Sequence, residues 1–132
     1  MKNIRYLNPR DDRYVVWLEG NSDIPDMGNT PADVQSLVID GLHIQDDACR
    51  QTKPYIAVDG RVRHCVVRNS DVLLSGVRGP VSLVETRGEL AKVDSLAVDN
   101  LSASGLAAVV RDDGRAVKAL ALNGVQVRST ER

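Results

Sequence analysis

The stretch VKALALNGVQV, residues 117–127, alternates apolar and polar residues, steps across an Asn-Gly pair and then resumes the alternation. The same eleven-residue phrase occurs three times before it, as VQSLVIDGLHI (34–44), VRHCVVRNSDV (62–72) and VDSLAVDNLSA (93–103). The copies begin at residues 34, 62, 93 and 117, so successive starts are 28, 31 and 24 residues apart. A fixed phrase at variable spacing indicates a solenoid, in which obligatory strands are joined by loops of free length.

The eighth position of the phrase predicts a corner. It holds Gly41, Asn69, Asn100 and Gly124, the residue types that most readily accept a left-handed backbone. Because strands have a period of two, positions four and six face one side, and positions nine and eleven resume that alternation after the corner. A two-residue hairpin at Asn-Gly is the competing interpretation. It is disfavoured because only the last copy has Asn-Gly, so we expect a bend with both halves facing one interior.

The segments between the phrases predict a third strand in each coil. Each reads as an apolar run followed by a charged cluster and a Gly: PYIAVDGR (54–61), PVSLVETRG (80–88) and LAAVVRDDGR (106–115), with RYVVWLEG (13–20) as a leading member. We therefore expect an all-β chain, a short parallel β-helix solenoid of about four to five coils with three strands per coil. Residues 1–33 would form an N-terminal cap and the first rung, and residues 34–132 the coils of the same single domain.

Composition narrows the class of protein. There is no Phe, one Trp and three Tyr, so Val, Leu, Ile and Ala must fill the core, as suits stacked short strands. The 17 basic and 18 acidic residues are interspersed, which argues against a nucleic-acid partner. The charged start predicts neither a signal peptide nor a membrane span, and hence a cytoplasmic or virion-associated location. Cys65 takes a position held elsewhere by Leu, so we expect it to be buried, whereas Cys49 lies in a polar stretch.

Three strands per coil, variable coil length and Asn or Gly at one corner resemble the right-handed parallel β-helix of the pectin-lyase-like superfamily. The resemblance covers about residues 13–128 and rests on the four phrases. It implies a right-handed coil, and enzymes of this fold use carboxylates to act on polysaccharides bound along one sheet. Leucine-rich repeats are the alternative, because VxxLxV with a following Asn is close to their consensus. That family's Asn stands one place later, and linkers such as PYIAVDG read as strands rather than helices.

The ends of the third strands carry the residues that such chemistry would need. Paired carboxylates serve glycoside hydrolysis, and an acid beside an Arg could act as a tuned base. The candidate catalytic residues are Asp59, Glu85, Asp112, Asp113, Arg61 and Arg111, with Glu19, Arg87 and Arg115 in the same clusters. The competing interpretation is that stacking brings these charges together as solvated ion pairs that discourage sideways aggregation. The sequence favours the ion pairs, because it lacks the partner motifs of the hydrolases.

Two further sets of residues are candidates for binding. Trp17 and Tyr14 in the first rung could stack on a sugar, or cover the open end of the core. The fifth phrase position points outward by parity, and a column of small apolar residues there is a candidate interface: Val38, Val66, Ala97 and Ala121. A local shift of parity that buries this column is the alternative. His43 and His64 have no ligand at suitable spacing, so we expect surface histidines, no metal site and no cofactor.

The leading functional expectation is a non-enzymatic structural or binding module that self-associates as a homo-oligomer. An assembly or adhesion component of a phage or cell-surface apparatus would be one such module. A solenoid this short exposes its terminal rungs, and either the last rung or a lateral face is expected to meet another chain. The alternative is a small carbohydrate-binding or polysaccharide-degrading protein, a lyase or glycoside hydrolase with a glycan partner. An inhibitor that binds another protein through its charged face is a third hypothesis.

Overall fold

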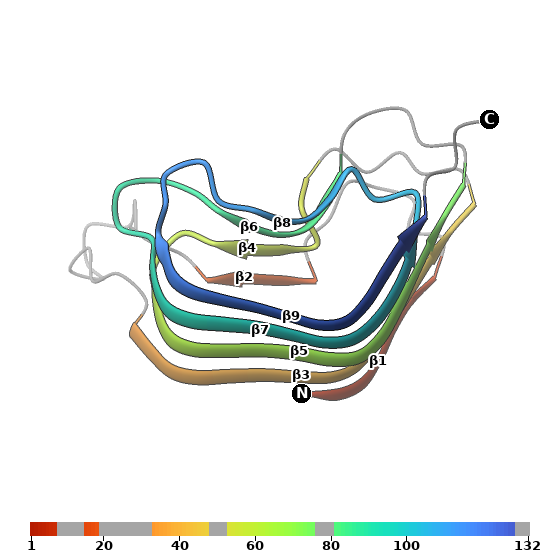
Figure 1. Cartoon of the computed structure of the whole chain (residues 1–132), viewed down its shortest axis with the longest axis horizontal. Coiled ribbons are helices and arrows are strands. Elements are labelled where there is room, and N and C mark those ends of the chain that lie inside the picture. Colours follow the sequence, from red (N-terminus) through yellow and green to blue (C-terminus); the bar gives the residue numbers. More distant parts are fainter. Residues whose placement is uncertain (8–14, 19–32, 48–52, 76–80, 129–132) are drawn as a thin grey trace, which may run out of the picture.

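The computed structural model describes residues 1–7, 15–18, 33–47, 53–75 and 81–128. In this part of the chain every regular element is a strand, and the strands wind into a parallel β-solenoid of about three turns (Figure 1). This confirms the predicted all-β class and the parallel β-helix. The expected count of four to five coils was too high, because it took each phrase for a coil, whereas four stacked phrases bound only three full turns.

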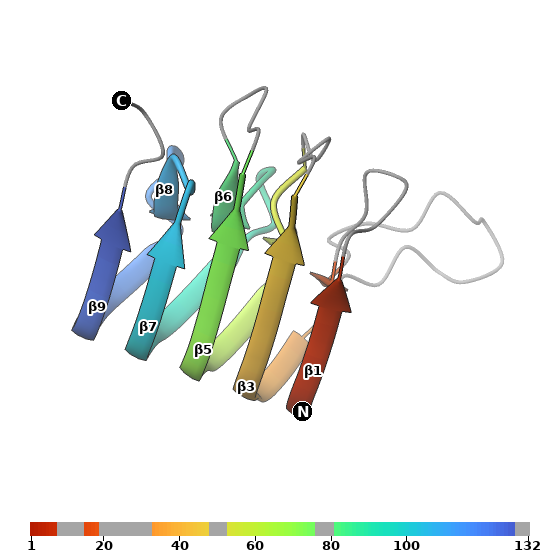
Figure 2. The same ribbon diagram turned by 90° about the vertical axis from the view of Figure 1, so that its right-hand side faces the viewer.

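Two parallel sheets form the walls of the solenoid. The larger sheet has five strands in the order β1 (Lys2–Leu7), β3 (Asp33–Asp46), β5 (Arg61–Leu74), β7 (Lys92–Ser104) and β9 (Val117–Arg128). The smaller sheet has four, in the order β2 (Val16–Leu18), β4 (Ile56–Val58), β6 (Ser82–Thr86) and β8 (Ala108–Arg111). The chain alternates between the sheets, so each turn adds one strand to both, with β1 and β9 at opposite edges of the larger sheet (Figure 2).

The register of the larger sheet stacks the four phrases position on position. The opening valines pair in sequence, Val34 with Val62, Val62 with Val93 and Val93 with Val117. The fourth and sixth positions follow in the same register, so each inward column runs through all four rungs. Phrases of fixed length therefore give strands without slips, whatever the length of the loops between them.

The eighth position is a corner in every rung, as the sequence predicts. Gly41, Asn69, Asn100 and Gly124 have φ angles of 82°, 52°, 58° and 62°. The ladder continues on both sides of the corner, so what the sequence divides into two strands is one bent strand in β3, β5, β7 and β9. Asn3, with φ of 54°, adds a fifth member to the corner column, because β1 pairs with the second half of β3.

The core fills the space between the sheets with aliphatic side chains. Ile39, Val67 and Val98, all at the sixth position, are 0% exposed, and Cys65 is buried in the Leu column, as expected. Burial raises the pKa of the Cys65 thiol to about 11. The aromatic contribution comes from Tyr55, whose ring packs edge-on against Tyr6 with 5.8 Å between ring centroids.

The first rung is made by β1 and β2, both within the range 1–33 that was assigned to a cap and a first rung. Most of the remaining residues in that range, 8–14 and 19–32, lie outside the described part of the chain. Tyr14, Glu19 and Cys49 also lie outside it. Within the described residues there is no helix, and hence no helical segment that could cross a membrane.

Candidate functional site

The outer face of the smaller sheet gathers most of the predicted catalytic residues. The register aligns Trp17, Ala57, Glu85 and Arg111 in one column across β2, β4, β6 and β8. The charged residues that follow β4, β6 and β8 lie next to this column. The stacking of rungs thus brings together side chains that are 26 to 42 residues apart in the sequence.

Asp59 is the centre of the first half of this cluster. Its carboxylate accepts a hydrogen bond from the Trp17 indole Nε1 at 2.9 Å and two from Arg87, from Nε at 3.0 Å and Nη2 at 3.1 Å. The two arginine bonds form a bidentate pair, the stronger geometry for arginine and carboxylate. Trp17 remains 52% exposed, with the edge of its ring tethered to Asp59.

The second half of the cluster is centred on Arg111. Its Nε lies 3.1 Å from an Asp113 oxygen and 3.7 Å from a Glu85 oxygen. Arg61, also a candidate, instead faces Asp94 at 3.6 Å, at the start of β5 and β7. Five of the six catalytic candidates thus lie in the cluster, each facing an opposite charge or a hydrogen-bond donor: Asp59, Glu85, Asp112, Asp113 and Arg111.

Asp112 has a structural position at the end of β8. Its Oδ1 accepts hydrogen bonds from the Thr86 hydroxyl at 2.5 Å and the Ala116 amide at 2.8 Å, and its Oδ2 accepts one from the Val117 amide at 2.9 Å. Burial raises the pKa of Asp112, but these hydrogen bonds outweigh it and hold the pKa below its ordinary value. A carboxylate that stays ionised and fully bonded fastens the turn into β9, whereas a general acid needs a raised pKa.

The chemistry available to this cluster is therefore ionic and hydrogen-bonded pairing. Asp59 and Asp112 are engaged by donors, and Glu85 and Asp113 share Arg111. Across the described residues, no group of three or more His, Cys, Asp or Glu side chains could hold a metal ion. An exposed indole beside an Asp-Arg pair does suit the stacking and hydrogen bonding of a sugar.

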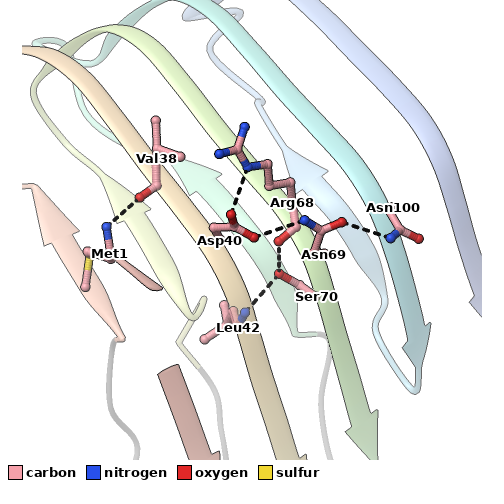
Figure 3. A network of polar contacts seen from close by, with 8 residues as sticks. All are labelled: Met1, Val38, Asp40, Leu42, Arg68, Asn69, Ser70 and Asn100. Carbon is pink, nitrogen blue, oxygen red and sulfur yellow. Dashed lines mark hydrogen bonds and ion pairs between the residues drawn. The ribbon is translucent and has the colours of Figure 1, made fainter. Parts of the chain in front are cut away.

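A second polar network, which the sequence analysis missed, follows the corner of the larger sheet (Figure 3). Asp40 accepts a hydrogen bond from the Asn69 amide at 3.0 Å and faces Arg68 Nε at 3.2 Å. Asn69 in turn accepts from the Asn100 amide at 2.9 Å. The Asn69 hydrogen bond lowers the pKa of Asp40, opposed by its burial and supported by Arg68 and Lys2.

Backbone atoms join the same network. The Ser70 hydroxyl donates to the Arg68 carbonyl at 2.9 Å and accepts from the Leu42 amide at 3.1 Å. The Met1 amine donates to the Val38 carbonyl at 2.9 Å, which holds β1 against β3 (Figure 3). The contacts run from rung to rung, so the corner ladder ties neighbouring coils together.

The seventh phrase position, just before the corner, alternates in charge along the solenoid. We call it the position-seven column, and its members stack in the order Lys2, Asp40, Arg68, Asp99 and Asn123. The Asn123 amide closes it with a hydrogen bond of 3.0 Å to Asp99. The alternation of charge is present in the aligned phrases. Its meaning depends on the register, which makes each of these residues the neighbour of the next.

The predicted interface column lies beside the position-seven column. Val38, Val66 and Ala97 are partly exposed and Ala121 is exposed, while their neighbours at the sixth position are buried in the inner rungs. Parity is thus outward, as predicted, and the proposed local shift that would bury these residues is wrong. On the other flank, the third position brings His64 within 2.9 Å of the Ser95 hydroxyl. His43 lies further along the strand and pairs with Asp71.

The last rung differs from the others in its exposure. Leu120 and Leu122 occupy the inward fourth and sixth positions, yet they are 51% and 48% exposed. No described strand pairs with the outer edge of β9, so its backbone groups on that side have no ladder partner among the described residues. Among the residues that the structure describes, the core is therefore open at this rung.

Comparison of the sequence with protein-family models and with curated proteins, and of the fold with solved structures, found no match. The resemblance to the pectin-lyase-like superfamily is thus one of architecture, the parallel β-solenoid.

Proposed function

We propose that this protein is a non-enzymatic structural module that associates with other chains, first of all with copies of itself, through its open last rung. The observation that carries the proposal is the exposure of the inward positions of β9. Ile39, Val67 and Val98 are completely buried in the sixth-position column, and Leu122, which continues that column, is 48% exposed.

Two physical terms favour a partner at this rung. Burying the exposed half of Leu120 and Leu122 would contribute about 1 kcal/mol for each side chain. Pairing the free edge would also satisfy a row of backbone donors and acceptors, which is why open parallel edges template further strands. A self-associating coil of this kind would serve as an assembly or adhesion component, such as part of a phage or cell-surface apparatus.

The polar clusters support a structural role over a catalytic one. The carboxylates of the smaller sheet are held by Trp17, Arg87, Arg111 or backbone amides, and the lowered pKa of Asp112 keeps it ionised. The arginine contacts among them support the solvated ion pairs that the sequence predicts as the alternative to a catalytic site.

The test is the mass of the full chain in solution, measured by sedimentation velocity between 5 and 200 micromolar (roughly the range over which weak interfaces dissociate). We expect a reversible oligomer, and at least a tenfold weaker association for Leu122→Gln. The matched control is Leu90→Gln, which changes an equally apolar side chain, 44% exposed, in the turn between β6 and β7. A wild-type chain that stays monomeric throughout would contradict the proposal.

A second candidate, glycan binding, is favoured by Trp17. This indole is exposed and oriented by Asp59, with Arg87 beside it. Because Trp17 is the one Trp in the chain, its fluorescence reports on this surface alone. Titration with neutral and acidic polysaccharides should shift the emission, and Asp59→Asn should weaken the effect while the fold is retained. No spectral change across such a panel would leave only the structural module.

A further inference from the structure

The lateral face of the larger sheet is built to match itself. We define this face as three outward columns of the four long strands: the position-seven column, the interface column, and the third-position column of Ser36, His64, Ser95 and Ala119. All three are straight, because the register runs without a slip. The interface column forms an apolar strip between the position-seven column and the third-position column.

We infer that this face docks on the same face of a second copy, with the two solenoid axes antiparallel. The inference goes beyond the proposed association at the open rung, because it names a different surface of the molecule. The two-fold axis would run along the strand direction, between β5 and β7. Such an axis keeps each column opposite itself and reverses the order of the rungs.

Charge complementarity is the first reason for this arrangement. Reversing the rungs places Arg68 of each copy opposite Asp99 of the other, and Asp40 opposite the amide of Asn123. An alternating column is complementary to its own reversed copy, so no like charges meet. A two-fold axis along the solenoid would instead set these charges opposite the Ser and His column, with no ion pairs.

Exposure leaves these groups available to a second copy. The Arg68 side chain is 46% exposed although it already faces Asp40, whose side chain is 26% exposed. Each guanidinium has five donors, so a bond within the chain does not exhaust it. The pairs would therefore extend an existing ladder across the two copies.

The apolar strip fits the same axis. The reversed order places Val66 opposite Ala97 and Val38 opposite Ala121, so that each larger side chain faces a smaller one. Alternating large and small residues across facing sheets lets the side chains interdigitate. A single two-fold axis therefore makes the facing columns of the two copies complementary in both shape and charge.

The area of the face sets the strength of the dimer. Four strands about 4.8 Å apart and five residues of about 3.3 Å rise give a face on the order of 300 Å². With side-chain relief the two copies would bury roughly 800 Å² in total, less than the roughly 1,200 Å² of stable specific interfaces and in the range of weak, transient ones. We therefore expect a weak, reversible dimer that forms at high micromolar concentration.

A charge-exchange experiment on the full chain tests the inference. Arg68→Asp makes both positions acidic and Asp99→Arg makes both basic, so each variant alone should dimerise at least tenfold more weakly in sedimentation velocity. An equimolar mixture restores both facing pairs, and the dimer should return as a heterodimer. Unchanged dimerisation of either folded variant, or a monomeric mixture of two folded variants, would overturn the inference.

Further variants keep the test decisive. Ala121→Lys changes an exposed side chain at the end of the strip and should also abolish the dimer, even if an Arg68 or Asp99 variant fails to fold. Arg111→Asp, on the other sheet, removes a comparable ion pair and should leave the dimer intact. If Leu122→Gln weakens association while Ala121→Lys does not, the open rung is confirmed and the lateral dimer is refuted.

Discussion

At the scale of single residues, the corner of each coil depends on residues that tolerate a positive φ. Asn69 and Asn100 do so and also bond across rungs, whereas Gly41 and Gly124 supply only the backbone conformation. The asparagines therefore stabilise the corner twice, through conformation and through the ladder.

Asn100 allows the two contributions to be separated. Asn100→Gly keeps the corner and loses the hydrogen bond to Asn69, and we expect it to lower the free energy of unfolding by about 0.5–1 kcal/mol. Asn100→Ala adds the left-handed strain, for a total of about 2 kcal/mol. Urea denaturation followed by circular dichroism measures both. Equal losses in the two variants would show that the φ of 58° is not a constraint.

Gly105 and Gly88 form a matched pair for a different constraint. Both have positive φ, of 90° and 81°, but a Cβ at Gly105 would lie 2.6 Å from the Leu74 carbonyl oxygen, whereas one at Gly88 would meet nothing within 4 Å. We expect Gly88→Ala to cost about 1 kcal/mol and Gly105→Ala at least twice that, because the backbone itself must move. Thermal unfolding of the two variants side by side gives the comparison.

Asp112 predicts how stability depends on pH. Its pKa is lowered in the folded protein and returns to about 3.9 on unfolding, so the ionised carboxylate stabilises the fold above that pH. The contribution is lost as the pH falls below about 4 and through the folded pKa. Asp112→Asn removes it at every pH, so the difference in Tm between wild type and variant should be larger at pH 6 than at pH 3. A difference independent of pH would mean that Asp112 acts without its charge.

At the scale of elements, the inner strands and the last strand share one sequence pattern but differ in what they bury. Leu96 in β7 and Leu120 in β9 are neighbours in the fourth-position column, yet Leu96 is 2% exposed and Leu120 is 51% exposed. Leu96→Ala should therefore cost about 2–4 kcal/mol and Leu120→Ala less than about 1 kcal/mol in the monomer. Similar losses in a dilute, monomeric sample would show that the last rung is covered.

The larger sheet could be predicted almost residue by residue because its phrase has a fixed length and a period of two. Positions one, four, six and eight admitted a single alignment, and the register reproduces it. The sequence did not predict a corner at Asn3, because β1 contains only the second half of the phrase. The pattern is nevertheless present in the sequence. NIRY (3–6) places apolar residues one and three positions after Asn3, as GLHI (41–44) does after Gly41.

The sequence predicted the strands of the smaller sheet but not the contacts between their side chains. Its segments differ in length and composition, so the sequence offered no alignment that would pair Asp59 with Arg87 and Trp17. Nor could it show that Asp112 bonds with Thr86 and two amides, because those contacts depend on the path of a turn. A repeat predicts which residues stack in a column of the larger sheet. Contacts near loops of variable length depend instead on the path of the chain in three dimensions.

At the scale of the whole molecule, a solenoid should tolerate the loss of one complete coil. Deleting residues 62–92 joins Arg61 to Val93, and Val93 then takes the place of Val62 against Val34. We expect a folded protein with β-type circular dichroism and a lower unfolding midpoint, because stability is roughly a sum over stacked units. Deleting residues 62–76, about half a coil, breaks the register and should abolish cooperative unfolding. A full-coil deletion that unfolds would contradict the additive view.

The coils of the solenoid differ in length, and this difference determines how the molecule would extend under a pulling force. Each long strand passes its corner without ending, so a pulling force at the two ends detaches a whole bent strand at once. Successive detachments release 24, 31 and 28 residues of chain, the spacings between paired positions. At roughly 3.5 Å per extended residue these are about 85, 110 and 100 Å. The molecule would thus lengthen under tension in discrete and individually recognisable steps.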